Sequence, residues 1–156
     1  MRRNLLAVVV AAGLLAVAPS VPAQNFNLAP TFGTIALIAG FTPDPRTIDV
    51  TAGGTIAADR LGGDCTGTIA NAPDVRVNYT AGTFPLYIFA QSRADVTLVV
   101  NLPDGSWICN DDLDGTNPGI VLNRPPTGQY DIWVGVFGGG QGVPARLGIS
   151  ELPPRR

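Results

Sequence analysis

The chain has 156 residues and a formal net charge of −2, with 19 Gly, 14 Pro, no His and no Lys. The lack of His excludes a Ser-His-Asp triad, a Cys-His dyad and any His-ligated metal site. The mild acidity gives no electrostatic footprint for nucleic acid or anionic lipid. The composition therefore predicts a protein that is not an enzyme and has no nucleic-acid partner.

The first 23 residues predict a cleavable signal peptide. Arg2 and Arg3 provide a positive start, residues 5–18 form an apolar run, and residues 21–23 offer small side chains for cleavage after Ala23. The apolar run is too short for a comfortable membrane span. An uncleaved anchor is the alternative, and it is disfavoured because no stop-transfer charges follow. The protein is therefore expected to be secreted or periplasmic, and its mature net charge is −4.

The mature chain is expected to contain residues 24–31 as a flexible lead-in, residues 32–152 as one domain, and residues 153–156 as a tail. Apolar and polar residues alternate with the period of a half-buried strand, and no stretch keeps a helical period. The alternation is clearest at 74–80, 130–137 and 145–149. Further candidate strands lie at 34–41, 46–51, 86–91 and 97–100.

Turn-forming residues separate these runs, as expected for short strands that follow one another closely. Strands with one wet face are typical of antiparallel sheets. The sequence therefore predicts an all-β fold, a single antiparallel β-sandwich of seven to nine strands with a jelly-roll-like arrangement. The separators lie at 42–45, 52–54, 81–83, 103–105, 125–128 and 138–142.

Cys65 and Cys109 are the two cysteines of the chain. In an oxidising compartment an even pair most simply forms one disulfide. Closing this loop would stabilise the fold by about 4 kcal/mol in the loop-entropy treatment. The alternative, two free or metal-binding thiols, is weaker because two thiolates without His make an incomplete zinc site.

The acidic segment 110–115 has the spacing of the first half of a calcium loop. Asn110, Asp112 and Asp114 supply oxygens at alternate positions, Asp111 lies between them, and a glycine follows. Residue twelve of such a loop is Val121 here instead of Glu, and no helices are expected on either side. Ca2+ is therefore a candidate cofactor, and a solvated acidic turn is the favoured alternative.

Trp133 alternates with Tyr130 along its predicted strand. If Tyr130 points into the sandwich, Trp133 lies on the outer face, where it could stack on a sugar ring or a peptide. The favoured alternative is that a loop or the N-terminal segment covers Trp133, because large aromatic side chains are usually buried.

Residues 92–151 contain a series of motifs in a characteristic order. They are Ala94-Asp95-Val96-Thr97-Leu98-Val99-Val100, Leu102-Pro103-Asp104-Gly105-Ser106-Trp107, Asn110-Asp111-Asp112, Pro126-Thr127-Gly128-Gln129-Tyr130-Asp131-Ile132-Trp133-Val134 and Arg146-Leu147-Gly148-Ile149-Ser150. Together these motifs resemble the bacterial pre-peptidase C-terminal domain, a jelly-roll β-sandwich often attached to secreted peptidases. One departure is that Thr97 stands where the family strand often carries a second acid after Asp95. The resemblance implies an accessory or binding domain without a peptidase.

These features together predict an exported, non-catalytic accessory or binding module. Its expected partner is a protein or polysaccharide at the cell exterior. Two alternatives remain open: a peptidase-associated processing or chaperone factor, and a structural component of the envelope or matrix. A glycosidase is disfavoured because the clustered acids lie in one loop, whereas that chemistry needs two carboxylates flanking the bond.

Overall fold

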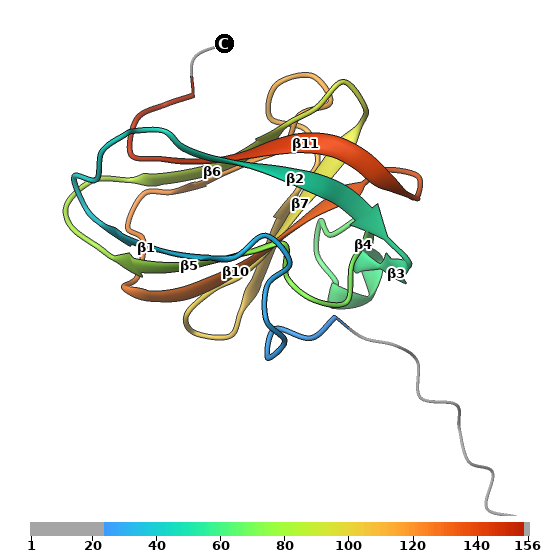
Figure 1. Ribbon diagram of the computed structural model, residues 1–156, viewed down its shortest axis with the longest axis horizontal. Coiled ribbons are helices and arrows are strands. Elements are labelled where there is room, and N and C mark those ends of the chain that lie inside the picture. The colour runs from blue at the N-terminus through green and yellow to red at the C-terminus, as the bar shows by residue number, and fades with distance from the viewer. Residues whose placement is uncertain (1–23, 155–156) are drawn as a thin grey trace, which may run out of the picture.

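The computed structural model describes residues 24–154, so the predicted signal peptide lies outside the described residues. Eleven strands form two sheets that face each other (Figure 1). A short 3-10 turn, η1 (Ala58–Leu61), is the one helical element among the described residues. None of the residues described forms a helix with the length and apolar character needed to span a bilayer. The predicted all-β sandwich is confirmed.

The first sheet has seven strands and the order β1-β5-β10-β7-β8, with β4 and then β3 joined to the last residue of β10. The second sheet has the order β2-β11-β6-β9. The strands of the first sheet are β1 (Thr34–Ile38), β3 (Ile56–Ala57), β4 (Thr68–Ile69), β5 (Val75–Thr80), β7 (Val96–Asn101), β8 (Trp107–Asn110) and β10 (Gly128–Val136). Those of the second are β2 (Arg46–Gly54), β6 (Leu86–Gln91), β9 (Gly119–Leu122) and β11 (Gly140–Ser150).

One pair departs from the antiparallel prediction, because β1 runs parallel to β5. Between β1 and β5 the chain passes through β2, β3 and β4. A connection of that length permits two strands to pair in parallel. All other strand pairs in the described residues are antiparallel.

The main core lies between the two sheets and follows the predicted alternation. Tyr130 and Val134 of β10 point into it together with Val77 and Tyr79 of β5. The rings of Tyr79 and Tyr130 meet edge to face, with their centroids 6.4 Å apart. Burying each such side chain contributes about 2 kcal/mol, so these two strands supply much of the stability.

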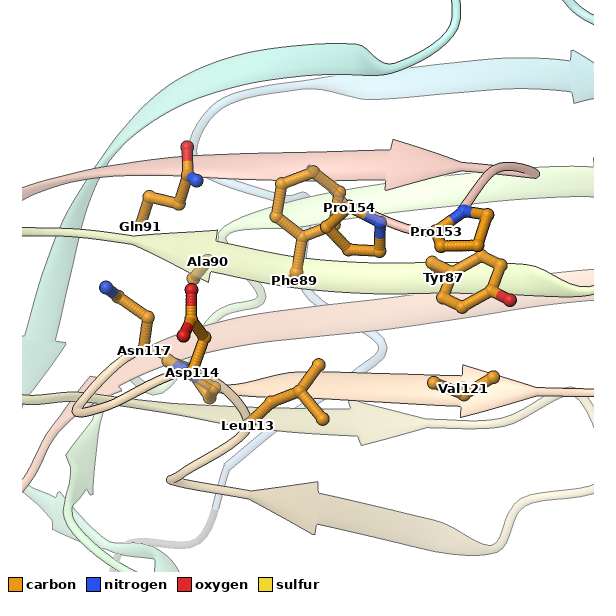
Figure 2. Close-up of a pocket in the computed structure, with 11 residues that line it drawn as sticks. Tyr87, Phe89, Ala90, Gln91, Leu113, Asp114, Asn117, Val121, Pro153 and Pro154 are labelled. Carbon is orange, nitrogen blue, oxygen red and sulfur yellow. The ribbon is translucent and has the colours of Figure 1, made fainter. Parts of the chain in front are cut away.

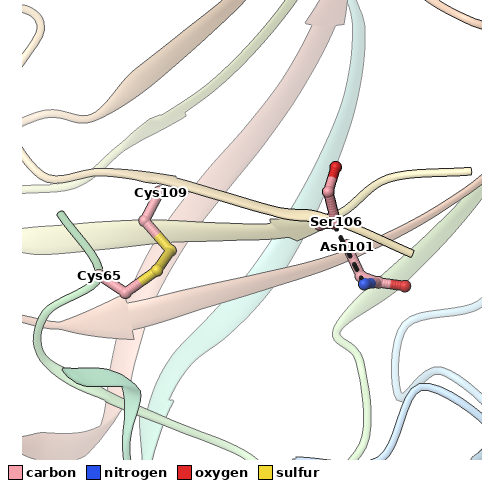
Figure 3. Close-up of a disulfide and its surroundings, with 4 residues drawn as sticks. All are labelled: Cys65, Asn101, Ser106 and Cys109. Atoms are coloured by element: carbon pink, nitrogen blue, oxygen red, sulfur yellow. Dashed lines mark hydrogen bonds between the residues drawn. A yellow bond between two sulfur atoms is a disulfide. The ribbon is translucent and has the colours of Figure 1, made fainter. Parts of the chain in front are cut away.

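A smaller apolar layer covers the outer face of the first sheet. Its centre is Trp133, which contacts residues of the segment that runs from β3 through η1 to β4. The predicted disulfide is confirmed: Cys65 of this segment is joined to Cys109 of β8 (Figure 3). Beside it, the Asn101 side chain donates to the carbonyls of Gly105 and Ser106, which closes the turn between β7 and β8.

The structure differs from the sequence-based expectation at one turn and at four short strands. The predicted turn at 52–54 is the end of β2, where Gly53 lies against Gly140 and Gly54 lies against the carbonyl of Ile69. A side chain at either glycine would collide with backbone, so these residues permit close approach of strands instead of reversing the chain. The strands β3, β4, β8 and β9 were not predicted, since they have only two to four residues and show no clear alternation.

Residues 24–31, which were expected to form a flexible lead-in, are hydrogen-bonded to the first sheet. The Asn25 amide donates to the Asn71 carbonyl at 2.7 Å, and the Thr31 amide donates to the Pro73 carbonyl at 2.8 Å. Phe26 meets the ring of Trp107 edge to face. Backbone hydrogen bonds of this kind cannot be read from the polarity of the segment.

Candidate functional site

The outer face of the second sheet carries a row of aromatic and small residues. Antiparallel register places Phe89 of β6 between Gly148 of β11 and Gly119 of β9. A Cβ atom at Gly148 would collide with the Phe89 ring, so the ring lies directly over this glycine. The next outward row contains Tyr87 of β6 and Val121 of β9.

Tyr87, Phe89 and Val121 form the floor of a groove of about 220 Å³ (Figure 2). Leu113 covers Gly119 from the loop before β9 and forms one wall, while Pro153 and Pro154 of the C-terminal tail form the other. Leu113 and Val121 are 47% and 40% exposed. The groove therefore offers apolar and aromatic surface to a ligand.

One end of the groove is polar. Gln91, Asp114 and Asn117 gather there, away from Tyr87 (Figure 2). The Asn117 Oδ1 atom accepts the Ser92 amide at 2.9 Å, and the backbones of Asp114 and Asn117 are hydrogen-bonded to each other. These contacts fix the loop that carries Leu113. The remaining amide and carboxylate atoms can orient a bound molecule.

The C-terminal tail reaches the groove because its start is anchored. The Glu151 amide donates to Asp44 Oδ2 at 3.1 Å, and the Glu151 carboxylate accepts the Tyr79 hydroxyl and the Gly40 amide, both at 2.7 Å. Burial and the adjacent Glu151 carboxylate raise the pKa of Tyr79, so its hydroxyl keeps the proton it donates. Leu152 follows, and Pro153 and Pro154 then line the groove on the side of Tyr87 and Phe89.

A second hollow of about 440 Å³ lies on the other side of the tail. It shares Phe89, Gln91 and the two prolines with the groove, and it is completed by residues of β2, β11 and the loop before β2. The tail therefore crosses a continuous concave face and divides it into two parts.

The acidic segment is placed differently from a calcium loop. Asn110 is the last residue of β8, and its Oδ1 atom accepts the Gly119 amide at 2.8 Å. Burial, and then the nearby charges of Asp112 and Asp111, raise the pKa of Asp95. Within the described part of the chain, no group of three or more His, Cys, Asp or Glu residues could hold a metal ion. Calcium binding through Asn110, Asp111, Asp112 and Asp114 stays a prediction.

The prediction that Trp133 stacks on a ligand is wrong. Trp133 does lie on the face opposite Tyr130, but its exposed fraction is 0%. The segment that carries Cys65 covers it. The ring centroids of Trp107 and Trp133 are 5.4 Å apart. The alternative reading, that a loop covers this tryptophan, is confirmed.

Sequence reasoning predicted the strand that carries Tyr87 and Phe89 but missed the groove. The outward position of both aromatic residues on one strand was the available signal. The walls come from residues 113 and 153–154, which are distant in the sequence and show no motif. Their meeting depends on the tertiary fold.

No family model matches the chain, and no curated protein matches it. Among solved structures, the chain is similar to PliG of Aeromonas hydrophila, a periplasmic lysozyme inhibitor of g-type lysozyme. The identity is 16%, the match covers 75% of this chain and 96% of that chain, and the TM-score is 0.39.

Proposed function

We propose that the protein is an exported, non-catalytic binding module that holds a proline-containing, extended protein segment in the groove over Phe89. One observation carries this proposal: the chain's own Pro153 and Pro154 already line that groove together with Phe89, so its aromatic surface accommodates proline beside it. Proline-rich segments dock in aromatic-lined grooves because their extended conformation is preformed and little entropy is lost on binding.

The chemistry of the groove supports a peptide better than a polysaccharide. The middle of the groove is apolar, because Phe89, Leu113 and Val121 contribute no hydrogen-bonding group. The polar side chains lie at its ends, with Gln91, Asp114 and Asn117 at one end and the Tyr87 hydroxyl at the other. A sugar chain needs polar partners along its length, whereas a proline-rich peptide needs ring contacts and a few carbonyl partners.

The test is a titration of the 15N-labelled protein with a synthetic peptide of repeated Leu-Pro-Pro. We expect amide shifts in β6, β9 and the loop 113–118. Leu113→Asp and Val121→Asp place a charge in the groove at exposed positions and should weaken binding by roughly tenfold or more. The matched control is Phe137→Asp, since Phe137 is equally exposed but does not line the groove.

Three outcomes would contradict the proposal. The first is an absence of shifts at millimolar peptide. The second is shifts that the two groove variants leave unchanged. The third is binding of a soluble cell-wall glycan at the same residues while the peptide fails to compete, which would assign the groove to a polysaccharide.

Calcium support of the groove is proposed separately, because Asp114 belongs both to the acidic segment and to the groove wall. A thermal melt with calcium and with chelator tests it. A calcium-dependent rise in Tm that is lost in Asp112→Ala would support the metal site, since a ligand that binds only the folded state stabilises that state. An unchanged Tm would reduce the segment to a turn.

A further inference from the structure

The open edge of the first sheet belongs to β1 (Thr34–Ile38). Among the described residues, β5 is the only strand paired with β1, and β1 is the last strand on its side of the sheet (Figure 1). A groove of about 690 Å³ runs along this edge and is lined by residues 34–43 and Arg46. The question is what such an edge can bind.

The direction of the backbone groups follows from two hydrogen bonds at the ends of β1. The Gly33 carbonyl accepts the Arg76 amide at 3.1 Å, and the Ala39 amide donates to the Thr80 carbonyl at 2.9 Å. In a parallel ladder alternate residues bond to the neighbouring strand, so the odd-numbered residues of β1 face β5. Thr34, Ala36 and Ile38 therefore direct their N–H and C=O groups away from the sheet.

This edge lacks the usual protection. Sheet edges are commonly blunted by charged residues, proline, bulges or a covering loop. The strand reads Thr-Ile-Ala-Leu-Ile and has no charge, and Arg46 is the one charged residue that lines the groove. Ile38 is 68% exposed, the largest fraction among the large apolar side chains of the described region. The free donors, free acceptors and apolar side chains fit another β-strand.

We propose that β1 pairs antiparallel with β1 of a second copy of this chain, which joins the first sheets of two molecules across a twofold axis at Ala36. The strand is chemically close to its own reverse: β-branched residues at both ends, aliphatic residues at 35 and 37, and a small residue at the centre. A twofold contact needs such self-complementarity, since residue i meets residue j and j meets i.

The pairing makes specific contacts. Thr34 of each copy lies opposite Ile38 of the other, a β-branched cross-strand pair of the kind that stabilises sheets. The three outward residues of each copy exchange their backbone hydrogen bonds, and no like charges meet within the strand. A five-residue edge is much smaller than the roughly 20 residues per side of a stable interface, so the dimer should be weak and concentration-dependent.

Analytical ultracentrifugation of the exported protein over a wide concentration range tests the proposal. We expect a monomer on dilution and a dimer at high concentration. Ala36→Pro removes an outward N–H without removing a bond to β5, and Ile38→Lys adds a charge at the edge. Both should remain monomeric at the concentration where the wild type is dimeric. Phe137→Lys, a charge at an exposed apolar residue outside the groove, should dimerise as the wild type does.

Amide hydrogen exchange gives a second readout that does not depend on a variant folding. In dilute protein the amides of Ile35 and Leu37 should be protected by β5, while those of Thr34, Ala36 and Ile38 exchange. At high concentration the latter three should slow by roughly tenfold. A wild type that is monomeric throughout would overturn the proposal. So would a dimer that persists in Ile38→Lys, or one that leaves exchange at β1 unchanged.

Discussion

Arg76 and Asp131 face each other across β5 and β10, with Nε of Arg76 2.6 Å from Oδ1 of Asp131. The other end of the guanidinium donates to the carbonyls of Phe26 and Leu28. The ion pair therefore joins two strands of the first sheet and also holds the N-terminal segment. Asp131 is buried, and its second oxygen accepts a hydrogen bond from Nε2 of the Gln129 side chain at 2.7 Å.

Asp131→Asn should lower the free energy of unfolding by about 3 kcal/mol, because removing one partner leaves a partly buried guanidinium without its counter-charge. Denaturant unfolding measures the change. Exchange of the Asn25 and Thr31 amides should also become faster, because their segment loses its anchor. The matched control is Asp49→Asn, which breaks the exposed pair of Arg146 and Asp49 and should have no measurable effect. Equal losses in both variants would contradict this account.

Reduction of the disulfide between Cys65 and Cys109 should lower the free energy of unfolding by about 4 kcal/mol. The bond fastens the segment that covers Trp133, so reduction without denaturant should also shift tryptophan fluorescence to longer wavelength. The main core between the two sheets does not depend on this bond, so the strands should persist and far-UV circular dichroism should change little. Free thiols in the folded protein, or unchanged fluorescence on reduction, would contradict the prediction.

Asp74 should make stability depend on pH. Asp74 is 2% exposed, and this burial raises its pKa from 3.8 to about 7. The Val134 amide donates a hydrogen bond to Oδ2 of Asp74 at 2.7 Å, and this contact opposes the rise. Between these two values the folded state holds a proton that the unfolded state has released. The stabilisation of the folded state by protonated Asp74 is therefore complete below pH 4 and is lost as the pH rises through 7.

Asp74→Asn keeps an oxygen that can accept the Val134 amide and removes the titration. Relative to the wild type, the variant should gain up to about 4 kcal/mol in the free energy of unfolding between pH 4 and pH 8. Denaturant unfolding of both proteins at the two pH values measures the difference. If the difference in the free energy of unfolding between the two proteins stays constant with pH, Asp74 does not titrate in this range.

The sequence predicted the parts of the fold that alternation determines. The faces of β5 and β10 were predicted correctly because Val77, Tyr79 and Val134 fill the space between two sheets, and a one-residue shift would expose them. The disulfide was predictable because the chain has only two cysteines. Local pattern was sufficient in these cases.

The remaining features depend on segments that meet only in the folded chain. Gly54 has the sequence environment of a turn, and only the approach of Ile69 explains why the strand continues through it. Trp133 points away from the main core, and it is buried because the segment held by the disulfide of Cys65 covers it. The groove combines one predicted strand with Leu113 and Pro153, which no local pattern connects.

The glycine beneath Phe89 has a consequence for how the groove can be altered. Gly148 has an ordinary strand conformation, so its backbone accepts alanine, and the obstacle to a methyl group is the aromatic ring above it. Gly148→Ala would push that ring upward into the space a ligand needs. A residue that no ligand touches thus sets the depth of the groove, and one carbon atom added from below would make it shallower while every residue lining it stays the same.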